Sequence, residues 1–179
     1  MDVATALIAS SRLPRGTVTH RVPCPLPSGL TLVAPPSTVL TIEHELKLRS
    51  VAAGLLMAWI EDTLRAGLYV PYSQITIGGF RWRDDHKLWC SLPMICWTGW
   101  TARGAREDAA VLMAESMVQR AQHELPTIVA TSVDPYLLQP RWPADEIQLD
   151  MMRTAPLVVR VSAQSVHTEQ LGVDPDGNK

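Results

Sequence analysis

Two stretches of the chain place mostly apolar residues at the spacing of an α-helix. In 44–66 this stripe comprises Leu48, Val51, Ala52, Leu55, Leu56, Trp59 and Thr63. Gly67 and Pro71 follow, and both residue types commonly end helices. In 104–123 the stripe comprises Ala109, Leu112, Met113, Met117 and Ala121. The pattern therefore predicts helices over 44–66 and 104–123.

Alternating patterns predict strands around these helices. The stretch 72–83 alternates up to Gly78–Gly79, where the phase changes as it does at a β-bulge. A polar turn at 84–86 leads into a return strand over 87–100. Shorter strands are predicted at 128–131 and 156–163, the second with a clear inward and outward alternation. We therefore expect an α+β fold, an antiparallel sheet with two helices packed on one face.

The remaining segments set the expected domain boundaries. Residues 1–43 contain six prolines, which remove backbone donors and favour an extended arm or an irregular hairpin. The stretch 132–154 is expected to be a loop with one helical turn near 145–151. Residues 164–179 form a polar tail. The core domain is thus expected over 44–163.

The predicted strand 87–100 is apolar on both faces, which requires a cover on each side. Four of the six tryptophans fall on the predicted hairpin, and tryptophan and arginine are the residues that anchor protein interfaces. A second copy of the chain is one candidate cover, and a tryptophan-rich core is the alternative. The residues expected at an oligomer interface are Arg81, Trp82, Arg83, Asp84, Asp85, Trp97, Trp100 and Arg103.

Composition excludes several classes of protein. The net charge of −2 and the pI of about 6.2 do not supply the basic surface that nucleic-acid binding needs. The Arg81–Arg83 stretch, a possible base-stacking strand, is followed at once by two aspartates. The chain has no apolar run of the roughly 18 residues that cross a bilayer and no basic signal sequence. Three cysteines do not make a disulfide framework and are typical of a reducing compartment.

No residue constellation predicts catalysis, a metal or a cofactor. His86, Cys90 and Cys96 have no common zinc-ligand spacing. The chain has no nucleophile elbow, and its adjacent carboxylates do not face one another on a helix. Gly78–Gly79 does not open a helix, so it is no phosphate cradle. The segment 98–106 before a helix is a possible anion site, although a plain strand-to-helix connection explains it better. We therefore expect that the protein is not an enzyme.

The chain resembles the tail-terminator or tail-completion proteins of long-tailed phages over about 44–163, with the segment 71–122 at the centre and the helix 44–66 in the place of the family's first helix. The resemblance lies in the order of elements: a strand that starts at Pro71–Tyr72, a hairpin, a loop with Arg103 and Glu107, an alanine-rich helix and a late strand at 156–163. It implies a structural virion protein that forms a ring, commonly a hexamer, caps the tail tube and joins it to the head connector. It also implies assembly in the host cytoplasm and location in the virion, with no membrane and no sequence-specific nucleic acid as a partner.

Two other hypotheses remain open from the sequence. One is a matrix-type structural protein of an enveloped virus, although no basic membrane-facing cluster supports it. The other is a small soluble ligand-binding domain or enzyme with a pocket lined by Trp82, Trp89 and Trp97.

Overall fold

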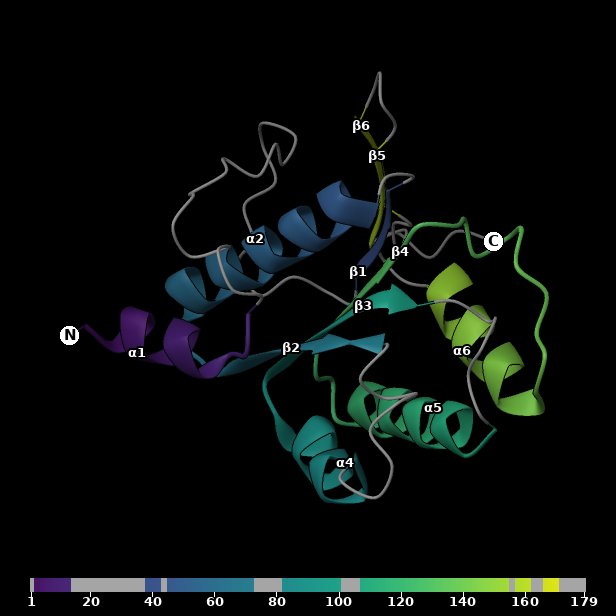
Figure 1. The fold of residues 1–179 in the computed structure, drawn as a ribbon, viewed down its shortest axis with the longest axis horizontal. Coiled ribbons are helices and arrows are strands. Elements are labelled where there is room, and N and C mark those ends of the chain that lie inside the picture. The colour runs from purple at the N-terminus through teal and green to yellow at the C-terminus, as the bar shows by residue number, and fades with distance from the viewer. Residues whose placement is uncertain are drawn as a thin grey trace, which may run out of the picture.

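The computed structural model describes residues 2–13, 38–42, 45–72, 82–100, 107–154, 157–161 and 166–170 (Figure 1). Its elements in chain order are α1 (Val3–Ser10), β1 (Thr38–Ile42), α2 (Glu45–Thr63), β2 (Gly67–Pro71), α4 (Trp82–Ser91), β3 (Met94–Trp100), α5 (Glu107–Gln122), β4 (Thr127–Thr131), α6 (Pro143–Arg153), β5 (Leu157–Val161) and β6 (Val166–Gln170). None of the helices in these described ranges is long and apolar enough to span a membrane.

The strands form one six-stranded sheet in the order β2-β3-β4-β1-β5-β6. The first five strands run parallel, and only β6 pairs antiparallel with β5. The expected antiparallel sheet is therefore wrong. The chain must cross over the sheet to return between parallel strands, and the helices between successive parallel strands provide these crossover connections.

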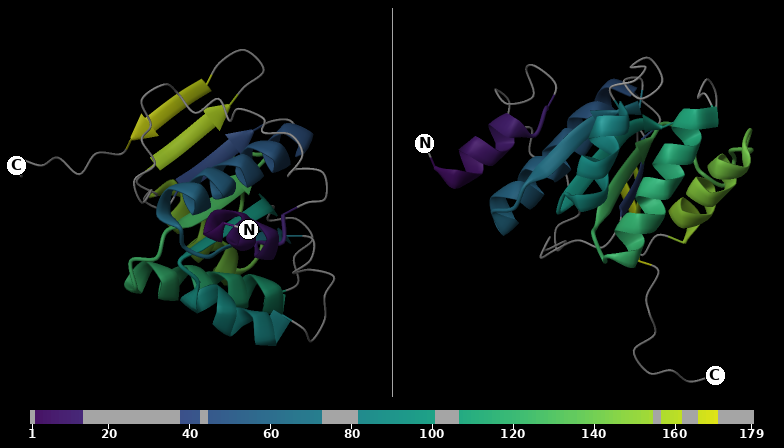
Figure 2. Two further views of the ribbon diagram at one scale, coloured as in Figure 1. Left: turned by 90° about the vertical axis from the view of Figure 1, so that its left-hand side faces the viewer. Right: turned by 90° about the horizontal axis from the view of Figure 1, so that it is seen from below.

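Helices cover both faces of this sheet, so the prediction of two helices on one face is also wrong. The right-hand view of Figure 2 shows α1 and α2 on one side of the strands and α5 and α6 on the other. On the α2 face, twelve buried residues form one core cluster: Leu48, Ala52, Ala53, Leu55, Leu56, Trp59, Ile60, Tyr69, Met94, Cys96, Ile128 and Ala130. The chain thus has the three-layer architecture of doubly wound α/β proteins.

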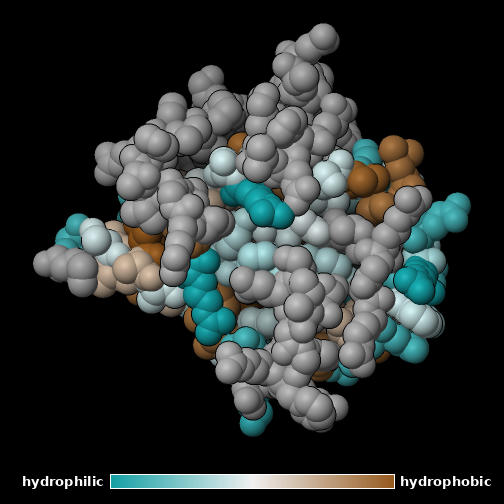
Figure 3. Space-filling view, viewed as in Figure 1, coloured by the Kyte–Doolittle hydropathy of each residue, from teal (hydrophilic) through white to brown (hydrophobic). Residues whose placement is uncertain are grey.

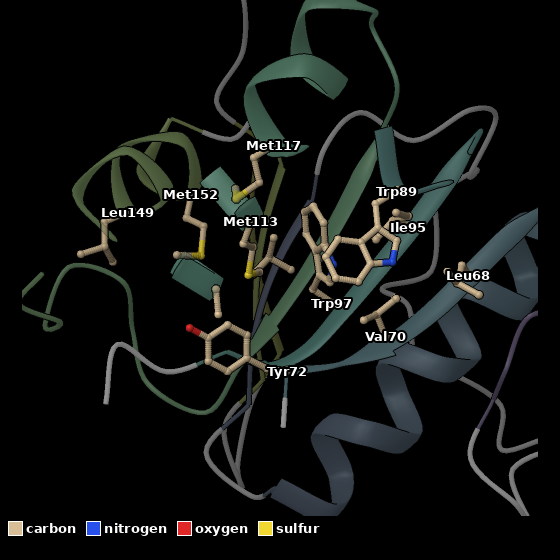
Figure 4. Close-up of a cluster of buried hydrophobic side chains, with 12 residues drawn as sticks. Leu68, Val70, Tyr72, Trp89, Ile95, Trp97, Met113, Met117, Leu149 and Met152 are labelled. Carbon is tan, nitrogen blue, oxygen red and sulfur yellow. The ribbon is translucent and has the colours of Figure 1, made fainter. Parts of the chain in front are cut away.

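The second core cluster lies on the face covered by α4, α5 and α6, and Figure 4 shows its side chains. Trp89 of α4 and Trp97 of β3 meet edge to face here, with ring centroids 6.5 Å apart and an interplanar angle of 86°. Trp97 is 0% exposed and Trp89 is 2% exposed. The two apolar faces of β3 are therefore covered by helices of the same chain, as is usual for a central parallel strand.

Several predicted elements are confirmed and others are not. The helices over 44–66 and 104–123 correspond to α2 and α5, and the strands at 128–131 and 156–163 correspond to β4 and β5. The hairpin is wrong, because Trp82–Ser91 is a helix whose inward residue is Trp89. Residues 73–81, with the proposed bulge, lie outside the described residues.

Four further elements lie in segments that the pattern predicted to be irregular. The loop at 132–154 contains α6, which is eleven residues long. Helix α1 and strand β1 come from the proline-rich segment 1–43, and β6 comes from the polar tail 164–179. The domain boundaries themselves stay predictions.

Arg120 forms hydrogen bonds that connect the amino-terminal ends of strands β3 and β4. Its guanidinium is 0% exposed and donates to the carbonyls of Trp89 and Leu92 at 2.6 and 2.7 Å, and to the carbonyl of Pro126 at 2.6 Å. Its Nε donates to the Thr127 hydroxyl at 2.9 Å. Burial lowers the pKa of Arg120 to about 10. One side chain thus connects the end of α4 with the chain that enters β3 and β4.

The outer edge of β2 is occupied by the residue that follows α1. The backbone carbonyl of Ser11 accepts the N–H of Tyr69 at 2.8 Å, and Ser11 is 0% exposed. Asp2 caps α1 by accepting the N–H of Thr5 at 3.0 Å. The amino-terminal helix is therefore attached to the sheet edge by a peptide hydrogen bond.

Candidate functional site

The topology places the candidate site between the carboxyl ends of β1 and β4. These strands are neighbours, yet the helix after β1 covers one face of the sheet and the helix after β4 covers the other. Chain segments that diverge in this way leave a crevice outside the sheet, and α/β proteins bind their ligands there. In P-loop proteins the same place, between a strand and the following helix, holds nucleotide phosphates.

The connection at the end of β1 does not fit a nucleotide. A P-loop occupies about eight positions, with glycines whose backbone N–H groups surround the phosphates and a Lys-Ser/Thr pair at its end. Here only Glu43 and His44 separate Ile42, the last residue of β1, from Glu45, the first residue of α2. Two glutamates in this stretch add negative charge where phosphates would need positive charge. The chain's own residues therefore contradict a phosphate cradle at this position.

No lysine elsewhere in the sequence has the neighbours of a P-loop lysine. The three lysines are Lys47, Lys87 and Lys179, and none of them follows a glycine or precedes a serine or threonine. The carboxyl end of β3, where P-loop proteins carry the acid that holds magnesium, continues as Thr98, Gly99, Trp100 and Thr101. Within the described ranges there is no group of three or more His, Cys, Asp and Glu side chains that could hold a metal ion.

The carboxyl ends of β3 and β4 have local features of their own. The pairing of β3 with β4 shifts register between Thr98 and Trp100. Gly99 at this bulge has a φ of +72°, which favours glycine. At the end of β4 the buried Thr131 hydroxyl accepts the N–H of Val133 at 3.2 Å, which turns the chain away from the sheet.

The connection from β4 to α6 exposes apolar side chains next to this edge. Leu137 is 78% exposed, Tyr136 is 59% exposed and Val133 is 39% exposed. The brown surface at the upper right of Figure 3 lies over this connection. Arg153 at the end of α6 donates to the carbonyls of Pro135 and Leu138 at 3.1 and 3.3 Å. The exposed apolar residues are therefore presented by a loop that the end of α6 holds in place.

Asp145 in the first turn of α6 is a buried carboxylate. Its Oδ2 accepts the N–H groups of Arg141 and Trp142, both at 3.0 Å, while Oδ1 has no partner in the described part of the chain. Burial, followed by the charge of Asp145, raises the pKa of Tyr72, so that hydroxyl stays protonated. The carboxylate holds the turn before α6 and explains why the helix begins there.

The residues predicted for an oligomer interface lie on different elements of the structure. Trp97 fills the core, which matches the alternative that the tryptophans are core residues. Asp85 is half-buried and pairs with Arg12 at 3.7 Å. Trp82, Arg83 and Asp84 belong to α4 and Trp100 to β3, while Arg81 and Arg103 lie outside the described residues. For the residues other than Trp97, an interface role stays a prediction.

Sequence reasoning missed two features of the molecule. The exposed connection carries a visible signal, since Pro135 is followed by Tyr136, Leu137 and Leu138 in a stretch with few charges. The contacts of Arg120 have no sequence signal, because the carbonyls that it binds belong to residues up to 31 positions away.

No protein-family model matches this chain, and no curated protein matches it either. Solved structures do match. A primosome component from Streptococcus pyogenes serotype M3 aligns over 89% of this chain and 75% of its own, with a TM-score of 0.57 and 10% identity. DnaI aligns over 72% of this chain and 73% of its own, with a TM-score of 0.59 and 11% identity. AMPPCP-bound DnaA from Aquifex aeolicus aligns over 72% of this chain and 41% of its own, with a TM-score of 0.58 and 7% identity.

These likenesses show the fold, and they overturn the resemblance to phage tail-terminator proteins. The matched structures are a primosome component, DnaI and DnaA, and the sheet of this chain is mostly parallel, so the expected tail ring, its tube and connector partners and the matrix-type alternative are wrong. A pocket lined by tryptophans is also unsupported, because Trp89 and Trp97 are buried against each other. The predicted location in a virion is not tested by these findings.

Proposed function

We propose that this protein is an assembly component in the initiation of DNA replication, and that it acts without binding a nucleoside triphosphate. The observation that carries the proposal is the match to a primosome component, to DnaI and to DnaA over 72% or more of the chain. A further match, to a DNA replication initiation factor, covers 72% of the chain with a TM-score of 0.55.

The nucleotide part of the proposal rests on the residues at the switch point. One matched structure holds AMPPCP, so the fold accommodates a nucleotide when the cradle is present. In this chain the two-residue connection from Ile42 to Glu45 leaves no room for a cradle and adds carboxylates. Without phosphate contacts, neither binding nor hydrolysis of ATP has a physical basis here. The role that remains for this architecture is recognition of other proteins.

The exposed connection after β4 is the surface that such recognition would use. Leu137 and Tyr136 are the most exposed large apolar side chains at the carboxyl edge of the described sheet. Aromatic and aliphatic side chains presented by a supported loop are typical of the centre of a protein interface. We expect Leu137→Asp to weaken association by at least about tenfold because it places a charge in a desolvated contact.

The test is quantitative cross-linking in the cells that produce the protein, with the captured proteins identified by mass spectrometry. We expect proteins of replication initiation to be enriched by the unchanged chain and to be lost with Leu137→Asp. The control is Val3→Asp, which places the same charge on another exposed apolar residue (61%), on α1, and should not alter capture. Capture that lacks replication proteins would refute the proposed role.

A second measurement addresses nucleotide separately. Calorimetric titration of the purified chain with ATP and magnesium should give no binding heat up to about 1 mM, a concentration at which even weak specific sites fill. Addition of ATP should also leave the captured set unchanged. Saturable ATP binding would refute the nucleotide part of the proposal while leaving the assembly role to the cross-linking result.

A further inference from the structure

A thiol, an imidazole and a carboxylate meet between α4 and α5, away from the candidate site. His86 and Cys90 lie one turn apart on α4, with 3.7 Å between His86 Nε2 and Cys90 Sγ. The Glu115 Oε2 atom of α5 lies 3.8 Å from the same imidazole nitrogen. Ser116, also on α5, places its hydroxyl oxygen 4.0 Å from the sulfur. Neither the proposed function nor the core packing requires this set of groups.

The two described cysteines differ in their surroundings. Cys96 is 0% exposed, its sulfur faces the Ala52 carbonyl at 3.7 Å, and burial raises the pKa of its thiol. Such a thiol is inert. Cys90 is only half-buried, and the His86 side chain beside it is 17% exposed, so both side chains are partly open to solvent. The chain therefore contains its own unreactive reference thiol.

Charges on both helices act on the sulfur of Cys90. On α5, the guanidinium of Arg120 binds the carbonyl of Trp89, the residue next to Cys90 in the chain. Also on α5, the Glu115 carboxylate lies 3.8 Å from His86 Nε2. On α4 itself, Asp85 is paired with Arg12, and Lys87 is exposed. A cation and a base next to a half-exposed thiol are the surroundings that make cysteines nucleophilic.

We propose that Cys90 is a site of reversible modification by low-molecular-weight disulfides, with His86 as the group that accepts its proton. In the reaction the thiol proton moves to His86 Nε2, and the thiolate attacks one sulfur of the disulfide. A new sulfur–sulfur bond forms to Cys90, the original disulfide bond breaks, and the second sulfur leaves as a thiolate that takes up the proton. Cys90 is oxidised, and the departing half of the disulfide is reduced.

The modification has a structural consequence because of where Cys90 lies. Trp89, its neighbour, supplies one of the carbonyls that Arg120 binds and packs against Trp97. A bulky group on the sulfur would separate α4 from α5 at this point. We therefore expect the modified protein to be less stable than the reduced protein.

The test measures the rate of mixed-disulfide formation with oxidised glutathione at pH 7.5 by intact-protein mass spectrometry. Cys24 is changed to Ser in every sample, so that Cys90 and Cys96 are the only thiols. We expect Cys90 to react about tenfold faster than N-acetylcysteine and Cys96 not to react in the folded chain. We expect His86→Gln to lower the rate about tenfold, and the control Lys87→Gln, an exposed change on the same helix, to leave it unchanged.

Two results would overturn the proposal. The first is a Cys90 rate no greater than that of N-acetylcysteine, which is measured with His86 unchanged and so does not depend on whether His86→Gln folds. The second is an unchanged rate in a His86→Gln protein whose circular dichroism matches that of the parent chain. A rate that falls with Lys87→Gln as much as with His86→Gln would also count against a specific role for the imidazole.

Discussion

Replacement of Arg120 by methionine tests the account of how the amino-terminal edge of the sheet is held. Methionine has a similar length and fills similar space, but it has no donors. The change leaves the carbonyls of Trp89, Leu92 and Pro126 and the hydroxyl of Thr127 without their donor. The bonds to Trp89 and Thr127 are fully buried, and the other two are partly buried. Water can therefore replace the donor at only some of these sites.

The expected magnitude follows from this difference in burial. Each buried acceptor that loses its partner costs about 1–3 kcal/mol, and a partly buried acceptor costs less. Removal of a desolvated charge without a carboxylate partner returns part of that cost. We expect the free energy of unfolding to fall by about 3 kcal/mol. For a chain of this length the melting temperature should then fall by about 6–12 °C.

Urea denaturation followed by tryptophan fluorescence measures the free energy of unfolding directly. Arg65→Met is the matched control, since it removes an exposed arginine of the same kind and should change stability by less than about 0.5 kcal/mol. An Arg120→Met protein within 1 kcal/mol of the unchanged chain, with an unchanged m-value, would show that these four hydrogen bonds do not hold the edge.

Three further predictions concern the core, the bulge and alkaline pH. Trp97→Ala should lower the free energy of unfolding, measured by urea denaturation, by about 3–5 kcal/mol. The molar mass of the protein in light scattering should stay the same. A change of molar mass without a loss of stability would contradict the position of Trp97 in the core. Gly99→Ala should cost about 1 kcal/mol because of the positive φ, and Gly99→Asn should cost less, so equal stabilities of all three proteins would count against a strained bulge. Above pH 10 the unfolded chain loses phenol protons that Tyr69 and Tyr72 keep when folded, since burial raises the pKa of Tyr69 to about 12 and that of Tyr72 also. The free energy of unfolding should therefore fall as the pH rises, by up to about 1.4 kcal/mol per pH unit for each of the two tyrosines. Arg120 partly offsets this fall, because its pKa is lowered in the folded chain and its effect has the opposite sign. A free energy of unfolding that stays constant or rises from pH 10 to 12 would refute the burial of these tyrosines.

The sequence contained enough information for the elements with a clear period. α2 and α5 follow from helical stripes, and β5 follows from its alternation. The helix α4 did not, because Trp89 and Cys90 extend the alternation of the following strand backwards. The buried face of α4 is defined by its packing against α5, and the sequence of α4 alone does not show that contact.

The parallel arrangement of the sheet could not be predicted because the sequence pattern did not predict strand β1. β1 has five residues after Pro35 and Pro36, and its neighbours β4 and β5 are 85 or more positions away in sequence. Without it, the chain shows no regular alternation of strands and helices. The apolar run in β3 then suggested an oligomer, whereas a central parallel strand is buried on both faces within its own chain. The candidate site could not be predicted for the same reason, since its position is defined only once β1 and β4 are known to be neighbours.

The hydrogen bond between Ser11 and Tyr69 determines how the protein can be shortened. A chain that starts after residue 13 would lack α1 and would leave the Tyr69 N–H of β2 without the Ser11 carbonyl that accepts it. Leu68, Tyr69 and Val70 are almost fully buried in the intact chain. Unprotected apolar edge strands pair with one another and aggregate. We therefore expect chains that lack the first thirteen residues to associate through the freed edge of β2 and to be less soluble than the intact chain.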